Sequence, residues 1–86
     1  MGGRTVDYML TDNDREILDF AALSWRYEGA RVSAIRERFG ISANVYAMRL
    51  GALIERPDAL EYAPQLVNRL LRLRDARRRA RVRSHA

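Results

Sequence analysis

Two apolar patterns of helical spacing flank a single glycine in the middle of the chain, and together they read IRERFGISANVYAMRLGAL over residues 35–53. Ile35 and Phe39 lie four residues apart, so they face the same side of a helix that we expect over residues 32–39. Gly40 follows directly and favours a left-handed backbone, which ends that helix. A glycine turn of this kind is typical of two helices that cross at a fixed angle.

A second helix is expected directly after the turn, over residues 43–55. Ser42 is a good N-cap because its hydroxyl accepts a backbone N–H of the first turn. The apolar residues of this helix share one face, namely Tyr46, Leu50 and Leu53, with Ile54 beside them. Ile41 is expected to turn inward between the two helices. The spacing therefore predicts a helix-turn-helix, whose second helix enters the major groove of DNA.

The outward face of this second helix supplies the candidates for reading DNA bases, which are Ala43, Asn44, Val45, Ala47, Met48 and Arg49. Asn44 is suited to pair with adenine, and Arg49 with guanine or a phosphate. A thymine methyl group would contact an apolar side chain, either Val45 or Ala47. The same pattern also fits a helical hairpin that is packed for stability alone.

A further helix is expected before this motif, over residues 12–27, with Thr11 as its N-cap. Aspartates in its first turn complement the positive end of the helix dipole. Its apolar residues recur along one face and are Ile17, Phe20, Ala21 and Trp25, with Leu18 beside them. The pattern predicts that Trp25 lies in the core and that Gly29 is the left-handed C-cap residue.

Two prolines organise the C-terminal third of the chain. Pro57 closes the helix over residues 43–55, a short helical turn is expected over residues 58–62, and Pro64 opens the last helix. This helix is expected to dock on the core through an apolar stripe made of Leu66, Leu70 and Leu73, widened by Val67 and Leu71. Its later residues are expected to project into solvent.

The expected fold class is all-α: a compact domain of about four helices that contains a helix-turn-helix and ends in a basic C-terminal helix. Residues 1–9 are expected to be a flexible arm, residues 10–75 the helical domain, and residues 76–86 the arginine-rich end of the last helix and its tail. A chain of 86 residues buries only a small core.

Composition argues against catalysis and against a bound metal or cofactor. The chain has no cysteine and one histidine, His85, so it offers neither a thiol nucleophile nor a set of metal ligands. We therefore expect no enzyme activity and no cofactor. No apolar run approaches the length of a membrane span and no signal-peptide pattern is present, so a cytoplasmic location is expected.

The net charge of +5 hides a strong asymmetry along the chain. Residues 1–63 hold eight arginines against ten acidic residues, a net of −2, whereas residues 64–86 hold eight arginines against one aspartate, a net of +7. These C-terminal arginines are the candidates for binding phosphate, and they are Arg69, Arg72, Arg74, Arg77, Arg78, Arg79, Arg81 and Arg83. So dense a block of like charge predicts a polyanionic partner, and double-stranded DNA is the leading candidate.

The order of aromatic, glycine and proline positions resembles a family of short helix-turn-helix-like domains of unassigned function, found in GC-rich Gram-positive bacteria and their phages. The resemblance covers most of the chain and rests on Leu10-Thr11, Ile17-Leu18 with Phe20, Trp25, Tyr27-Glu28-Gly29-Ala30, Ile35-Arg36-Glu37, Phe39, Ile41-Ser42 with Tyr46, Leu53-Ile54-Glu55-Arg56-Pro57 and Leu66-Val67-Asn68-Arg69-Leu70. It implies a DNA-binding or transcription-associated role and assigns no residue a function.

The function expected from the sequence is therefore DNA binding by a small transcription-associated or nucleoid-associated factor. An alternative is a protein-interaction module that binds another protein, for example the transcription machinery, or a second copy of itself through the leucine stripe. A last helix lying on an anionic membrane is a third reading. That helix lacks an aromatic anchor and its leucines are needed to cover the core, so no membrane partner is expected.

Overall fold

A computed structural model describes residues 9–85 of the chain, with side chains as far as residue 82, and all regular structure in this part is helical. The helices are α2 (Asp12–Ala21), α3 (Glu28–Phe39), α4 (Ala43–Leu53), α5 (Pro57–Tyr62) and α6 (Pro64–His85). The all-α class is confirmed, with five helices in the described residues where about four were expected. The predicted flexible arm lies, apart from Met9, outside the described residues.

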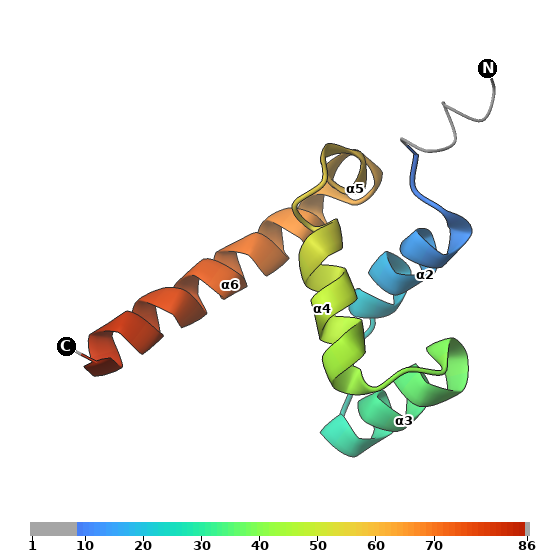
Figure 1. Ribbon diagram of the computed structural model, residues 1–86, viewed down its shortest axis with the longest axis horizontal. Helices are drawn as coiled ribbons and strands as arrows, with labels where there is room; N and C mark the ends of the chain where they lie inside the picture. The colour runs from blue at the N-terminus through green and yellow to red at the C-terminus, as the bar shows by residue number, and fades with distance from the viewer. Residues whose placement is uncertain (1–8, 86) are drawn as a thin grey trace.

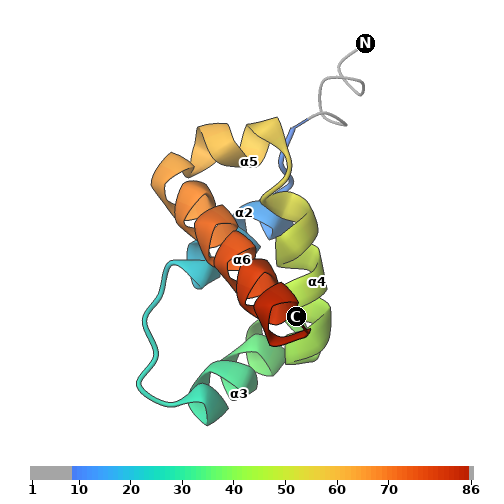
Figure 2. The same ribbon diagram turned by 90° about the vertical axis from the view of Figure 1, so that its left-hand side faces the viewer.

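The helices form a body and one long projection. Figure 1 shows α2, α3 and α4 grouped together, while α6 starts beside α5 and extends away from them. In the view turned by 90°, α6 runs toward the viewer in front of the other helices (Figure 2). The longest dimension of the molecule is 52 Å, against 29 and 20 Å. No helix of residues 9–85 combines the length and the apolar character that a bilayer crossing needs.

Helix α2 begins as the sequence predicts but ends six residues earlier, at Ala21 instead of residue 27. At its start Thr11 and Asp14 form a capping box: the Asp14 N–H donates to Thr11 Oγ1 at 3.0 Å, and the Thr11 N–H donates to the Asp14 carboxylate at 3.1 Å. At its end the N–H groups of Ala22 and Leu23 bond back to carbonyls of the last turn. The chain then needs the irregular segment of residues 22–27 to reverse direction toward α3.

Helix α3 begins at Glu28, four residues before the predicted start at residue 32. Gly29 therefore lies inside its first turn, and its predicted role as a C-cap is wrong. The Glu28 carboxylate accepts two hydrogen bonds from the Arg31 guanidinium, at 2.8 and 3.0 Å. A pair at this i, i+3 spacing supports a helical first turn, and negative charge there also complements the helix dipole.

The core is a single cluster to which every helix contributes except for the projecting end of α6. Its buried apolar residues are Leu10, Ile17, Leu18, Phe20, Ile35, Tyr46, Leu53, Ile54, Ala59 and Val67. Trp25 is not among them, so its predicted place in the core is wrong: 37% of the residue remains exposed. Because α2 ends before Trp25, this ring is carried by the irregular segment and covers the core from outside, 5.4 Å from the Phe20 ring between centroids.

The C-terminal half corrects two further predictions. Helix α4 ends at Leu53, two residues earlier than expected, and Pro57 starts α5 instead of closing α4. The predicted short turn after Pro57 and the start of the last helix at Pro64 are confirmed. In α6 the fully buried residue is Val67, whereas Leu73 is 48% exposed and lies beyond the docked part of the helix.

Burial ranks the aromatic residues of this core by their expected contribution to stability. We expect Phe20→Ala to lower the free energy of unfolding by about 3–5 kcal/mol, because the ring is almost completely buried. Trp25→Ala removes a ring that keeps contact with water and should cost less, about 1–2 kcal/mol. Urea unfolding followed by circular dichroism measures both. An equal or larger loss for Trp25→Ala would contradict the peripheral position of this ring.

Candidate functional site

The connection between α3 and α4 has the predicted backbone. Gly40 adopts a left-handed conformation with φ 67° and ψ 23°, and its N–H donates to the Arg36 carbonyl at 2.9 Å. A Cβ at Gly40 would meet no atom within 4 Å, so the backbone angle and not space explains the glycine. Two residues later the Ser42 hydroxyl accepts the Val45 N–H at 3.2 Å and caps α4.

Aromatic packing fixes how α3 and α4 lie against α2. The rings of Phe39 and Tyr46 have centroids 5.6 Å apart, and each also meets the edge or face of Phe20, at 5.6 and 5.4 Å respectively. The Tyr46 hydroxyl donates to the buried carbonyl of Ile17 at 2.7 Å. One side chain of α4 is thereby bonded to α2 and packed against α3, which sets the orientation of α4.

Helix α4 exposes five of the six predicted base-reading residues: Asn44, Val45, Ala47, Met48 and Arg49. Ala43 differs, because it is partly buried and packs against the core. The exposed face is poor in long polar side chains, and its most exposed large residue is Met48, at 74%. Arg49 borders a shallow pocket that also contains Asp14 and Arg56, so its guanidinium lies in a mixed electrostatic environment.

The predicted phosphate-binding arginines fall into three groups. Arg74 is ion-paired, with 2.7 Å between its Nη1 and Glu55 Oε2, and its buried Nε has no acceptor. The other arginines with described side chains are exposed, and these are Arg69, Arg72, Arg77, Arg78, Arg79 and Arg81. The side chain of Arg83 lies outside the described residues.

Among residues 9–82 no carboxylate forms an ion pair with five of these exposed arginines, which are Arg69, Arg72, Arg77, Arg78 and Arg79. The nearest acid along the helix is Asp75, which is itself exposed. Their charge is therefore available to an outside partner.

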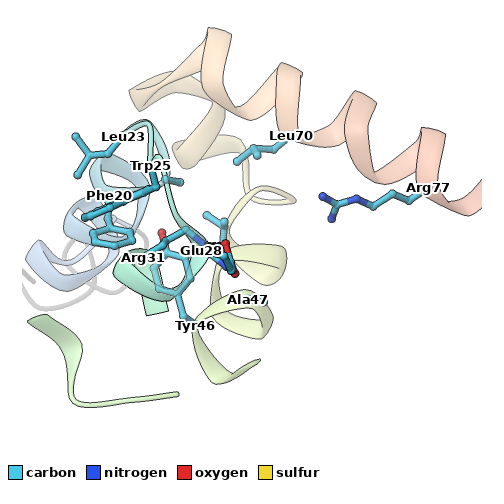
Figure 3. Close-up of a pocket in the computed structure, with 11 residues that line it drawn as sticks. Phe20, Leu23, Trp25, Glu28, Arg31, Tyr46, Ala47, Leu70 and Arg77 are labelled. Atoms are coloured by element: carbon cyan, nitrogen blue, oxygen red, sulfur yellow. Dashed lines mark hydrogen bonds and ion pairs between the residues drawn. The ribbon is translucent and has the colours of Figure 1, made fainter. Parts of the chain in front are cut away.

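A cleft of about 420 Å³ separates α6 from the body, and sequence reasoning missed it. Figure 3 shows Leu70 and Arg77 on the α6 side, with Leu23 and Trp25 across from them. Ala47 of α4 also lines the cleft. The one signal in the sequence was the spacing of seven between Leu70 and Arg77, which puts them on the same face of a helix.

A family model described as a protein of unknown function (DUF3263) matches residues 9–82. The chain belongs to this family. The match begins before α2 and ends near the C-terminal end of α6, so the family includes both the body and the arginine run. No curated protein and no solved structure matches the chain. Membership in DUF3263 thus brings no activity with it, and the function has to be argued from the geometry.

A few titratable groups of this DUF3263 chain have pKa values that local contacts or burial shift. Burial raises the pKa of the Tyr46 phenol to about 12. The hydrogen bond from Arg31 lowers the pKa of the Glu28 carboxyl, and the hydrogen bond to Asp19 raises the pKa of the Tyr62 phenol. The described residues contain no cluster of three acidic or histidine side chains that would hold a metal ion.

The phenol of Tyr46 makes stability depend on pH in the alkaline range. Its pKa is about 12 in the folded protein and 10.0 ordinarily, so its contribution is complete below pH 10 and is lost as pH rises toward 12. We expect Tyr46→Phe to cost about 1 kcal/mol at neutral pH, because the hydrogen bond to Ile17 is lost.

Urea unfolding at a series of pH values should show the wild type losing more stability than Tyr46→Phe as the pH is raised from 10 to about 12. The two proteins differ only in the hydroxyl of residue 46, so the effects of all other groups cancel in the comparison. Parallel pH profiles for the two proteins would contradict the assignment.

Proposed function

We propose that this protein binds double-stranded DNA as a small helix-turn-helix factor, transcription-associated or nucleoid-associated, with α4 in the major groove and α6 along the phosphates. The observation that carries the proposal is the set of exposed α6 arginines without an ion-pair partner among residues 9–82. Like charges this close on one helix repel one another, and a row of phosphates relieves that repulsion by releasing counterions.

The α3–α4 pair supports the proposal through its backbone. A left-handed Gly40, a serine-capped second helix and an exposed outer face on that helix are the features that a helix-turn-helix needs to present α4 to a groove. Helices α2, α3 and α4 would then be the three helices of the DNA-binding body.

Proximity of α4 to α6 gives a second line of support. Ala47 of α4 and Arg77 of α6 border the same cleft, so the outer face of α4 and the basic helix are neighbours. A duplex that met α4 would bring its flanking phosphates close to α6. The two predicted sets of DNA contacts are therefore compatible with one bound duplex.

Affinity and sequence preference are expected to come from different helices. The exposed face of α4 offers one amide, Asn44, and one guanidinium, Arg49, to the base edges. Contacts between arginine and phosphate carry no base information. Most of the binding free energy should therefore come from α6 and be common to all sequences, with a modest preference contributed by α4.

Salt dependence tests the phosphate contacts. If five or six arginines contact phosphate, log K should fall against log salt with a slope of about −5, because each neutralised phosphate contributes about −0.9. Fluorescence anisotropy with a random-sequence duplex, measured from about 50 to about 200 mM salt, gives this slope. Absence of binding at the lowest salt, or tight binding that salt does not weaken, would refute the proposal.

Substitutions in the two helices should have different effects. Replacing Arg77, Arg78 and Arg79 with alanine should weaken binding to every sequence and make the slope about 3 units shallower. Asn44→Ala should instead alter the preference among sequences selected from a random library, with little change in overall affinity. Arg26→Ala, in the irregular segment before α3, is the control and should change neither property. A sequence-selective effect of the triple replacement would reverse the assignment of the two helices.

A further inference from the structure

The cleft between α6 and the body is bordered by apolar side chains that are left partly exposed. Leu23 is 51% exposed and Trp25 37%, both on the body side, and Leu70 on α6 is half-buried. A small protein ordinarily covers such residues, because every exposed apolar area forfeits the free energy of burial. Leu23 and Trp25 lie next to each other on one wall of a cleft, with Leu70 on the other wall, so a partner that fills the cleft would bury all three.

Helix α6 turns one defined face toward this cleft. Leu70 and Arg77 both line the cleft and are seven residues, about two helical turns, apart, so they lie on the same side of the helix. Arg74 lies on this side too, and its ion pair with Glu55 at the end of α4 ties the helix to the body at this point. The α6 wall is therefore held in place, and it is not a free arm.

Charge distinguishes the two walls. On the body side Glu28 and Arg31 form an ion pair with each other at 2.8 Å, so the body wall carries no net charge. On the α6 side Arg77 lines the cleft without an ion-pair partner among residues 9–82. The cleft is thus apolar along its floor and positive along one wall.

We propose that this cleft binds an amphipathic helix of a partner protein, with apolar residues in the cleft and carboxylates against Arg77. A helix docks in a groove through apolar anchors at i, i+3 or i+4 and i+7, and the cleft offers Leu23, Trp25 and Leu70 to such anchors. Carboxylates complement the positive wall and give the complex its orientation.

A second copy of the chain is a poorer occupant. Within residues 9–85, the one projecting helix that it could insert is its own α6, which carries eight arginines and would face Arg77 and its neighbours with the same charge. The apolar residues of α2, α3 and α4 are mostly used in the core. The proposal does not rest on DNA binding, because its apolar contacts are made by the body and the first turns of α6.

The single tryptophan of the chain lines the cleft and reports directly on its occupation. The probe is a designed helical peptide without tryptophan, with leucines at i, i+4 and i+7 and glutamates on the other face. We expect it to produce a saturable change in Trp25 fluorescence. Two control peptides should produce none: one with the same composition and scattered leucines, and one with every glutamate replaced by lysine.

A matched pair of charge reversals separates a docked peptide from general attraction to α6. Arg77→Glu changes the cleft wall, whereas Arg79→Glu makes the same change in charge two residues later, on the opposite side of the helix. We expect Arg77→Glu to weaken binding of the glutamate peptide by about tenfold or more, and Arg79→Glu by no more than about twofold. Both residues are exposed, and circular dichroism checks that both variants fold.

Three results would overturn the proposal. The first is that the glutamate peptide produces no change in Trp25 fluorescence. The second is that Arg77→Glu and Arg79→Glu weaken peptide binding equally, because that would mean that the charge of the whole helix attracts the peptide. The third is a Trp25 signal that has another source. That source is a second copy if the signal depends on protein concentration and tracks a dimer in sedimentation. It is nucleic acid if a short duplex produces the signal and, like the glutamate peptide, depends on Arg77 but not on Arg79. The salt slope for DNA tests the proposed function separately.

Discussion

The buried phenol of Tyr46 is the point on which the arrangement of the other helices depends. Its ring fills the space where α2, α3 and α4 meet, and its hydroxyl satisfies a carbonyl of α2 that is far away in the sequence. With α4 held in this way, Glu55 at its end is in position to bind Arg74, and α6 takes its direction from that pair and from the buried Val67. A core this small has few other contacts that could substitute.

Local chemistry made part of this fold predictable. Thr11, Gly40, Ser42 and Pro64 each act through the backbone of their immediate neighbours, so the sequence alone indicates what they do. The boundary between α2 and α3 was misjudged because the apolar spacing continues through Trp25 although the helix does not. Where the chain turns depends on how α3 packs on α2, and no local pattern contains that information.

The candidate site likewise contains features that the sequence predicts and features that only the tertiary structure shows. The exposure of α4 and the charge of α6 follow from spacing and composition, and both were foreseen. The cleft was not, because its walls come from α2, the irregular segment, α3, α4 and α6, and only the tertiary structure brings them together. The pairing of Arg74 with Glu55 spans 19 residues and likewise removes one arginine from the predicted phosphate-binding set for a reason that is invisible in the sequence.

The projecting end of α6 separates the charge of the protein from the packing of its core. Every residue from Asp75 to Val82 is exposed, and none belongs to the core. Substitutions there leave the packing of the body unchanged, so selection can add or remove an arginine without a compensating change elsewhere. The charge of this end can therefore change in evolution while the folded body stays the same.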